Sequence, residues 1–214
     1  MMDLRFKNNT IFQIVGPSGC GKTLFTVQLL SSNCFRNKIK NIYWLMGTKD
    51  GERGLTSKSM KHLKNVTYLD GFEEGWMDKP KQNDVIVVDD LFNEAIKEKN
   101  FTNLFTKIAK HRFVTVVFIT QNMFHQGGQH RTRNLNVHYL VLFKNPRDST
   151  VVEYLARQAF PGDKQFLVDA FKDATQKIPY GYLLLDFTQD CPEEIRVRTD
   201  SFNSKVITIY KECI

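Results

Sequence analysis

Short apolar runs recur along the chain, separated by longer polar or amphipathic stretches. In chain order they are Ile11–Val15, Ile42–Met46, Val85–Val88, Val114–Ile119, Tyr139–Phe143 and Tyr182–Leu185. Several are rich in β-branched residues and show little alternation between apolar and polar positions. That pattern is typical of strands buried on both faces of a parallel sheet. The runs therefore predict the strands of one central sheet.

Helical stretches lie between these predicted strands. In Asn100–Arg112, apolar residues recur at spacings of three, four and seven, which places them on one face of a helix. Alternation of strands and helices predicts a doubly wound α/β sheet with right-handed crossovers. We expect the apolar stripe of 100–112 to pack against that sheet.

Two segments fall outside this alternation. Gly47–Gly75 is polar and rich in glycine, with one short candidate strand at Val66–Leu69, so we expect a surface insertion. The segment after Asp186 is predicted to form a hairpin through Ile195–Arg198 and Val206–Tyr210, with a role in assembly. Neither segment contains a repeat or a stretch of low complexity.

Length and composition fit one globular domain. The chain has 214 residues, of which 42% are hydrophobic and 25% charged. We expect a single domain over 1–214, with a core at about 11–186 and a C-terminal extension at about 187–214. The net charge of +7 gives mild support to an anionic partner such as nucleic acid.

The cysteines and the longest apolar runs indicate the compartment. The four cysteines form no CxxC pair and lie at no zinc-ligand spacing, which favours free thiols in a reducing environment. No signal peptide is evident, and every apolar run is far shorter than the roughly twenty residues that span a membrane. We therefore expect a soluble intracellular protein without a membrane span.

The clearest chemical motif directly follows the first predicted strand. It consists of Gly16, Pro17, Ser18, Gly19, Cys20, Gly21, Lys22 and Thr23. The glycines permit the tight curvature that aims backbone N–H groups inward, and Lys22 reaches the β- and γ-phosphates. Thr23 begins a predicted helix, Thr23–Leu30, and offers its hydroxyl to magnesium. The motif predicts a phosphate-binding loop for ATP and Mg²⁺.

A pair of acids supplies the second part of the predicted site. Asp89 and Asp90 directly follow the apolar run Val85–Val88, where two carboxylates are costly unless something pairs with them. We expect Asp89 to hold magnesium through a bound water and Asp90 to polarise the attacking water. Many related ATPases have Glu in the second place, and the shorter Asp90 carries the same charge but reaches less far.

An amide at the end of a further strand supplies the third part. The run 113–120 ends in Gln121 and Asn122, and either amide could lie beside the γ-phosphate. An amide donates to phosphate and accepts from water, so it can report whether the γ-phosphate is present. The alternative is a polar strand end that simply begins a loop.

The order of these motifs narrows the class of enzyme. A phosphate loop, one intervening strand, an acid pair and then a strand ending in Gln is typical of additional-strand ATPases, which work as rings on polymers. A GTPase is disfavoured because no Asn-Lys-x-Asp motif is present, and Asn145–Asp148 resembles one only in its letters. A small nucleotide kinase stays an alternative, because Arg131 and Arg133 could be the arginines of a lid.

Eight segments along the chain resemble one family of motors. They are Gly16–Thr23, Val85–Leu91, Phe118–Gly127, Arg131, Leu135–Asn136, His138–Phe143, Lys144–Asp148 and Leu155–Gln158. The chain resembles the genome-packaging ATPases of Polinton/Maverick elements and related eukaryotic DNA viruses, which are similar to the poxvirus packaging ATPase and belong to the FtsK–HerA superfamily. The similarity spans roughly Ile11 to Asp186. Its Thr-Gln-Asn…His-Gln-Gly and Lys-Asn-Pro-Arg-Asp stretches are more specific than its Walker motifs.

The resemblance implies a ring ATPase, hexameric or pentameric, that pumps double-stranded DNA into a preformed capsid through its portal or vertex. It implies that Gln121 is the amide of the fourth core strand. It also implies that Arg131 completes the site of the neighbouring subunit, with Arg133 and Arg147 as the other candidates. The corresponding location is the nucleus or viral factory of the host, or the virion. Some relatives carry a nuclease or winged-helix domain that we do not find here, so we expect the ATPase core to grip the DNA.

Two groups of basic residues are candidates for contacting DNA. They are Arg36, Lys38 and Lys40, and Lys58, Lys61 and Lys64. Either group could line a ring channel and contact phosphates without distinguishing bases. A solvated charged face is the alternative for each. A different nucleic-acid translocase or helicase stays open beside the packaging motor and the nucleotide kinase.

Overall fold

The computed structural model describes residues 3–47, 60, 63–72, 75–91, 112–123, 137–148, 150–176, 178–202 and 206–212. Its strands are β1 (Ile11–Val15), β2 (Ile42–Met46), β3 (Val66–Asp70), β4 (Val85–Asp89), β5 (Thr115–Thr120), β6 (Tyr139–Phe143), β7 (Tyr182–Asp186), β8 (Val197–Thr199) and β9 (Thr208–Tyr210). Its α-helices are α1 (Lys22–Ser31), α7 (Thr150–Ala159) and α8 (Lys164–Gln176). Short 3₁₀ turns lie at Trp76–Asp78 and Glu193–Ile195.

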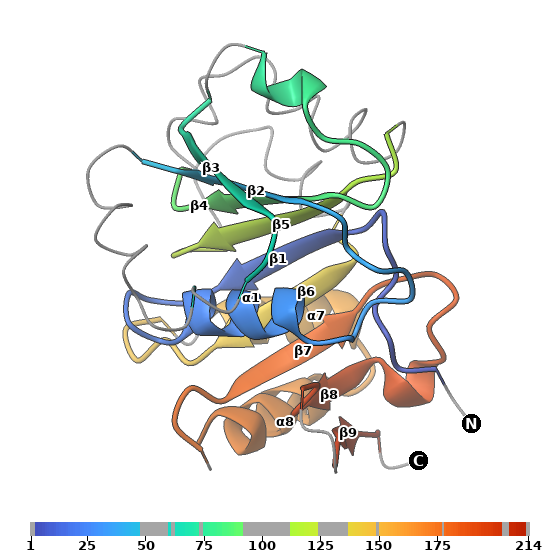
Figure 1. The fold of residues 1–214 in the computed structure, drawn as a ribbon. Helices are drawn as coiled ribbons and strands as arrows, with labels where there is room; N and C mark the ends of the chain where they lie inside the picture. The colour runs from blue at the N-terminus through green and yellow to red at the C-terminus, as the bar shows by residue number, and fades with distance from the viewer. Residues whose placement is uncertain are drawn as a thin grey trace.

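The strands form one nine-stranded sheet in the order β3-β2-β4-β5-β1-β6-β7-β8-β9 (Figure 1). The pairs from β3 across to β6 in that order are parallel, whereas the pairs β6–β7, β7–β8 and β8–β9 are antiparallel. The predicted fold class, a mostly parallel α/β sheet flanked by helices, is confirmed. Strand β5 lies between β1 and β4, as the additional-strand arrangement requires.

Apolar side chains cover both faces of the sheet. On one face, Phe25 of α1 belongs to a buried cluster with Phe12 and Trp44 of the sheet. On the other, Leu155 of α7 and Leu167 of α8 pack into the opposite cluster. Figure 1 shows α1 on one side and α7 with α8 on the other. Burial on both faces explains why the central strands lack alternation. The helix expected at 100–112 lies, apart from Arg112, outside the described residues.

The short candidate strand at Val66–Leu69 is confirmed as β3, but it belongs to the sheet rather than to a surface insertion. β3 pairs in parallel with β2 over five residues and forms one edge of the sheet. Thr67 and Tyr68 are exposed and Leu69 is buried, because an edge strand has only one neighbour. Its apolar pattern is therefore weak. Two strands, rather than the one expected, separate β1 from β4 along the chain.

The hairpin expected after Asp186 is present as β8 and β9, with shorter strands than predicted. Strand β8 is buried along its length and pairs with β7. Arg198 of β8 donates to Oδ2 of Asp186 at 3.1 Å, and both side chains are buried. The Arg198 guanidinium also lies 5.7 Å from the ring centre of Phe6. These contacts join the C-terminal hairpin to the sheet and to the N-terminal segment.

Candidate nucleotide-binding site

The glycine-rich loop connects β1 to α1 and is held between two neighbouring strands. Gly16 donates its N–H to the carbonyl of Thr120, at the end of β5, at 3.2 Å. A Cβ on Gly16 would approach Cys20 Sγ to 2.6 Å and Phe143 Cβ to 2.7 Å, so a larger residue would displace the loop. Gly21 has a φ of +105°, in the region that favours glycine. The sequence therefore fixes a tight loop directly before the first turn of α1.

Lys22 is a buried cation that forms no ion pair with another described residue, although its charge acts on Asp89. Its side chain is 7% exposed, and its Nζ donates to the carbonyls of Gly16 at 2.7 Å and Pro17 at 3.0 Å. The ion pairs of the described residues do not include it. A charged group is rarely buried unless it is paired. The loop, the helix start and this cation together favour an anion.

Thr23 lies beside this cation in the first turn of α1 and is exposed. No hydrogen bond of its hydroxyl to the described residues is found, whereas the Thr26 hydroxyl donates to the carbonyl of Lys22 at 2.9 Å. The Thr23 oxygen is thus available to a ligand. Hard cations such as Mg²⁺ take oxygen ligands of this kind.

The acid pair ends β4 next to the loop. Burial raises the pKa of Asp89 to about 6, and the charge of Asp90 adds to the rise. A hydrogen bond from Trp44 Nε1 to Asp89 Oδ2, 3.2 Å long, and the charge of Lys22 act in the opposite direction. Asp90 turns away from the strand with a φ of +50°, and its N–H donates to the carbonyl of Ile119 at 3.3 Å. The two carboxylates therefore occupy different environments.

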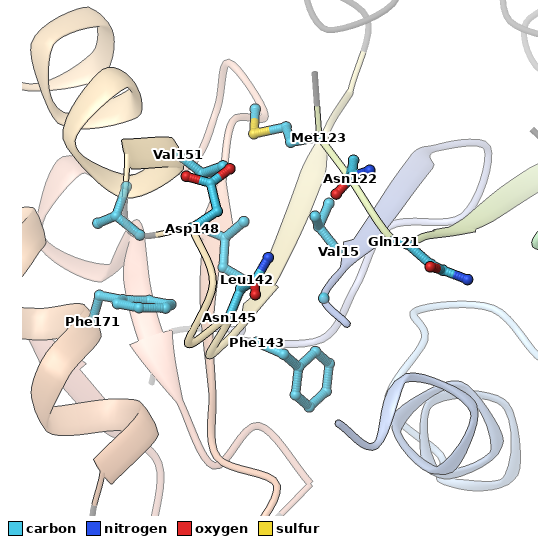
Figure 2. Close-up of a pocket in the computed structure, with 12 residues that line it drawn as sticks. Val15, Gln121, Asn122, Met123, Leu142, Phe143, Asn145, Asp148, Val151 and Phe171 are labelled. Carbon is cyan, nitrogen blue, oxygen red and sulfur yellow. The ribbon is translucent and has the colours of Figure 1, made fainter. Parts of the chain in front are cut away.

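Gln121 is the amide that reaches the acid pair. The parallel register sets Asp89 opposite Ile119, so the residues that follow lie at the same edge of the sheet. Gln121 Nε2 lies 3.4 Å from Asp90 Oδ2, within hydrogen-bonding distance. Gln121 and Asn122 both line a neighbouring cavity, and in Figure 2 the Gln121 side chain points away from Asp148. Of the two amides that the sequence left open, the structure brings Gln121 to the acids.

That cavity has a volume of about 260 Å³ and lies between the ends of β1, β5 and β6 and the helices α7 and α8 (Figure 2). Val15 and Asn122 line it on the sheet side, and Asp148 and Phe171 line it on the helix side. Asp148 accepts hydrogen bonds from the N–H and hydroxyl of Thr150 at 3.0 and 2.6 Å, at the start of α7. Its carboxylate is thus engaged in helix capping.

The structure brings Lys22, Thr23, Asp89, Asp90 and Gln121 to the carboxyl edge of the parallel strands. Sequence reasoning missed Trp44, which it counted only as part of a strand. Trp44 lies two residues before Met46, the partner of Asp89 in the register, and no local motif marks that relationship.

The structure does not place the other predicted site residue. Arg131, together with Arg133, Lys58 and Lys61, lies outside the described residues. Arg147 is exposed after β6, with its N–H donating to Asn145 Oδ1 at 3.1 Å.

Lysines from both candidate DNA-binding groups meet at the opposite edge of the sheet. Lys38 and Lys40 precede β2, Lys64 precedes β3, and all three are exposed around one depression of about 390 Å³. We find no ion pair from them to another described residue. Arg36 differs, because it pairs with Asp3 at 3.4 Å. The depression is therefore a concentrated positive surface at the amino ends of β2 and β3.

No family model matches the chain. At 28% identity, 127 residues align with the uncharacterized protein L666 of Acanthamoeba polyphaga mimivirus, covering 54% of this chain and 51% of that protein. The chain thus spans about half the length of this curated relative. Among the described helices, none has the length and apolar character needed to cross a membrane.

Solved structures resemble the chain over nearly its full length. B204, the DNA-packaging ATPase from Sulfolobus Turreted Icosahedral Virus, gives a TM-score of 0.54 at 12% identity, covering 98% of this chain and 100% of that one. The genome packaging NTPase B204 from Sulfolobus turreted icosahedral virus 2, in complex with sulfate, gives 0.53 at 15%, covering 97% and 98%. Its complex with ATP-gammaS gives 0.51 at 13%, covering 95% and 98%. The resemblance to packaging ATPases is thereby confirmed as a shared fold.

Proposed function

We propose that this chain is an ATP-hydrolysing motor that works as a ring and packages double-stranded viral or element DNA into a capsid. The observation that carries the proposal is the buried Lys22 cation, which forms no ion pair with another described residue and lies in a tight loop at the start of α1. A triphosphate supplies the charge that this position lacks. The fold shared with B204, solved as a genome packaging NTPase with ATP-gammaS and AMPPCP, favours ATP and a packaging role.

The loop and helix start would hold the phosphates in a fixed orientation. Backbone N–H groups between Ser18 and Thr23 would donate to the phosphate oxygens, and Lys22 would move from its two carbonyl partners to the β- and γ-phosphates. Thr23 and Asp89 offer the oxygen ligands that Mg²⁺ prefers, so these two residues would hold the metal. When bound, Mg²⁺ neutralises charge on the transferring phosphoryl group.

Asp90 and Gln121 would act on the attacking water. Asp90 accepts the water's hydrogen bond and polarises it, while the Gln121 amide, 3.4 Å from that carboxylate, positions Asp90 and donates toward the γ-phosphate. Gln121 would thereby connect the acid pair on β4 to the strand beside the loop. Loss of the γ-phosphate would free its amide.

The ring and DNA parts of the proposal use other surfaces. Arg131 would reach the site of the next subunit and neutralise charge in the transition state, in a hexamer or pentamer. Lys38, Lys40 and Lys64 would contact DNA phosphates without distinguishing sequence. The partners would be double-stranded DNA and the capsid portal or vertex. The motor would act in the nucleus or viral factory of the host, or in the virion.

The test is ATP turnover by the purified chain, measured with and without double-stranded DNA beside native mass analysis of assembly. We expect an assembled protein whose turnover rises with DNA of any sequence and loses that stimulation as salt is raised. Lys22→Ala should bind no ATP and show no turnover. Phosphoryl transfer to a nucleoside monophosphate, without DNA stimulation, would contradict the motor and support the kinase. Wild-type turnover by Lys22→Ala would contradict the assignment of the nucleotide site to this loop.

A further inference from the structure

We infer that Tyr180 is the platform on which the purine base of the bound nucleotide stacks. This inference deepens the proposed function, and it rests on the phosphate site at Gly16–Thr23. Neither the sequence motifs nor the fold comparison assigns a residue to the base. Four observations on the described residues point to Tyr180.

First, the Tyr180 side chain lies against the phosphate-binding loop. A Cβ placed on Gly21 would be 3.0 to 3.2 Å from three atoms of Tyr180, of which two belong to the ring. Gly21 directly precedes Lys22, so the ring lies next to the residues that would hold the phosphates. The absence of a side chain at Gly21 is what allows the ring to approach so closely.

Second, the ring is exposed although it is held in place. Tyr180 is 60% exposed, and no hydrogen bond of its hydroxyl to a described residue is found. An aromatic face that is open to solvent beside a ligand site can take a flat partner. Stacking of a base on an aromatic side chain is sequence-tolerant, because every base has a π-face.

Third, the turn that carries Tyr180 is fixed by helix α8. A Cβ on Gly181 would lie 2.3 Å from the carbonyl oxygen of Ala174, so only glycine permits this packing. The Gly181 N–H donates to the carbonyl of Ile178 at 3.1 Å and closes the turn. Within the described residues, Tyr180 and Phe113 are the bulky side chains with positive φ, and Tyr180 has +60°. A bulky residue adopts that conformation only where its surroundings impose it.

Fourth, the order of the strands places Tyr180 at the nucleoside end of the site. The residues proposed to act on the γ-phosphate lie at the ends of β4 and β5, on one side of β1: Asp89, Asp90 and Gln121. The nucleoside must then extend to the other side, toward β6 and β7. Tyr180 lies on that side, two residues before β7 begins at Tyr182.

One further exposed side chain would border the base. Leu24 is 39% exposed and lies three residues after Gly21, so both residues share a face of the first turn of α1. An apolar edge beside an aromatic platform suits a purine, whose two rings give a larger stacking area than a pyrimidine. Tyr180 would therefore hold ATP and GTP alike and both more tightly than CTP or UTP.

The test compares ligands with and without a base. Equilibrium binding of ATP, GTP, CTP and inorganic tripolyphosphate, each with Mg²⁺, is measured on the full chain and on Tyr180→Ala, Tyr180→Phe and Tyr180→Trp. We expect Tyr180→Ala to weaken ATP and GTP about tenfold or more and to leave tripolyphosphate unchanged, because stacking is lost while the loop is kept. The Phe and Trp variants should bind purine nucleotides like wild type. Ile178→Ala, an exposed change in the same turn, should leave the affinity for each of the four ligands unchanged.

The outcomes separate this inference from the function on which it rests. If wild type binds neither ATP nor tripolyphosphate, the phosphate site fails. If wild type binds both and Tyr180→Ala keeps its affinity for ATP, the base platform is overturned while the phosphate site stands. Equal weakening of ATP and tripolyphosphate would also overturn it, because Tyr180 would then act only by supporting the loop at Gly21.

Discussion

Trp44 on β2 donates its indole N–H to Oδ2 of Asp89 at the end of the neighbouring strand β4, 3.2 Å away. This bond favours the charged form of Asp89, yet burial outweighs it and raises the pKa of Asp89 to about 6. The folded protein thus holds this carboxylate at a cost. A metal ion at this position would offset that cost in free energy.

Asp89→Asn should stabilise the nucleotide-free protein above neutral pH. The pKa of Asp89 rises from 3.8 to about 6, so the charged form destabilises the fold by up to about 3 kcal/mol above pH 6. As the pH falls from about 6 to about 4, the folded state takes up the proton and the penalty disappears. Thermal unfolding should therefore show Asp89→Asn several degrees more stable than wild type at about pH 8, with the difference shrinking at about pH 5.

The same variant should lose function while it gains stability. Without the Asp89 carboxylate, Mg²⁺-dependent turnover should fall by about a hundredfold or more. Equal melting temperatures at both pH values would show that Asp89 is a solvated strand end. Retention of turnover would show that Asp89 is not a ligand of the metal.

Asp90→Asn should separate binding from chemistry. Asn keeps the size of Asp and can still accept the hydrogen bond from Gln121, but it cannot polarise water as a carboxylate does. We expect ATP with Mg²⁺ to bind within about threefold of wild type and hydrolysis to fall by about a hundredfold or more. Single-turnover hydrolysis beside equilibrium binding measures both. Turnover at the wild-type rate would place the base elsewhere.

Gln121 and Asn122 form a matched pair for testing the amide. Both side chains line the cavity beside α7 and α8, but of the two only Gln121 has a hydrogen bond to the Asp90 carboxylate among the described residues. Gln121→Ala should therefore lower turnover by about tenfold or more with ATP binding retained, and Asn122→Ala should have little effect. The reverse result would exchange the roles of the two amides and show that Asn122 faces the nucleotide.

The central part of the fold could be predicted because its signals are local. Strands β1, β2 and β6 match their predicted bounds, since runs buried on both faces stand out from their polar flanks. The phosphate loop and the first turn of α1 follow from one continuous motif. Asp89, Asp90 and Gln121 could be placed together because the carboxyl ends of neighbouring parallel strands share an edge.

The remaining features depend on contacts between distant parts of the chain. Strand β3 lacks a strong apolar pattern because it is an edge, so its pairing with β2 was not evident. Trp44 reaches Asp89 only through the register of β2 and β4. Tyr180 meets Gly21 only because the turn after α8 packs beside the loop. A Tyr-Gly pair signals a turn but not what lies next to it.

Removing the lysines around the depression before β2 and β3 should impair the stimulation of hydrolysis by DNA and nothing else. Replacing Lys38, Lys40 and Lys64 together by Ala should abolish most DNA stimulation and leave DNA-free hydrolysis unchanged, because the site lies at the other edge of the sheet. The dependence of log affinity on log salt should become shallower by about one for each DNA phosphate that the variant no longer neutralises.

A triple variant with equal loss of charge is the control for that experiment. Lys164, Lys172 and Lys211 are exposed lysines on α8 and the C-terminal segment, far along the sheet order from β2 and β3. Their joint replacement by Ala should leave both the stimulation and the salt dependence intact. Equal losses in the two triple variants would show that total charge, and not the depression, attracts DNA.

Arg131 tests whether each site needs two subunits. One lysine and one magnesium ion leave part of the transition-state charge of the γ-phosphoryl group unneutralised, and a guanidinium from a neighbour can supply the remainder. We expect Arg131→Ala to bind ATP and to lose turnover by about a thousandfold or more. Arg133→Ala and Arg147→Ala, changed in the same way, show whether the effect belongs to this arginine.

Mixing decides whether Arg131 acts within its own chain or across a subunit boundary. Arg131→Ala subunits keep an intact loop, and Lys22→Ala subunits keep an intact arginine, so a shared site can contain one working copy of each. Co-assembled mixtures should therefore regain turnover that neither variant shows alone, with a maximum near equal proportions. If mixtures proven to co-assemble by native mass analysis stay inactive, Arg131 acts in its own chain or not at all. Turnover would then give no chemical reason for an obligate ring.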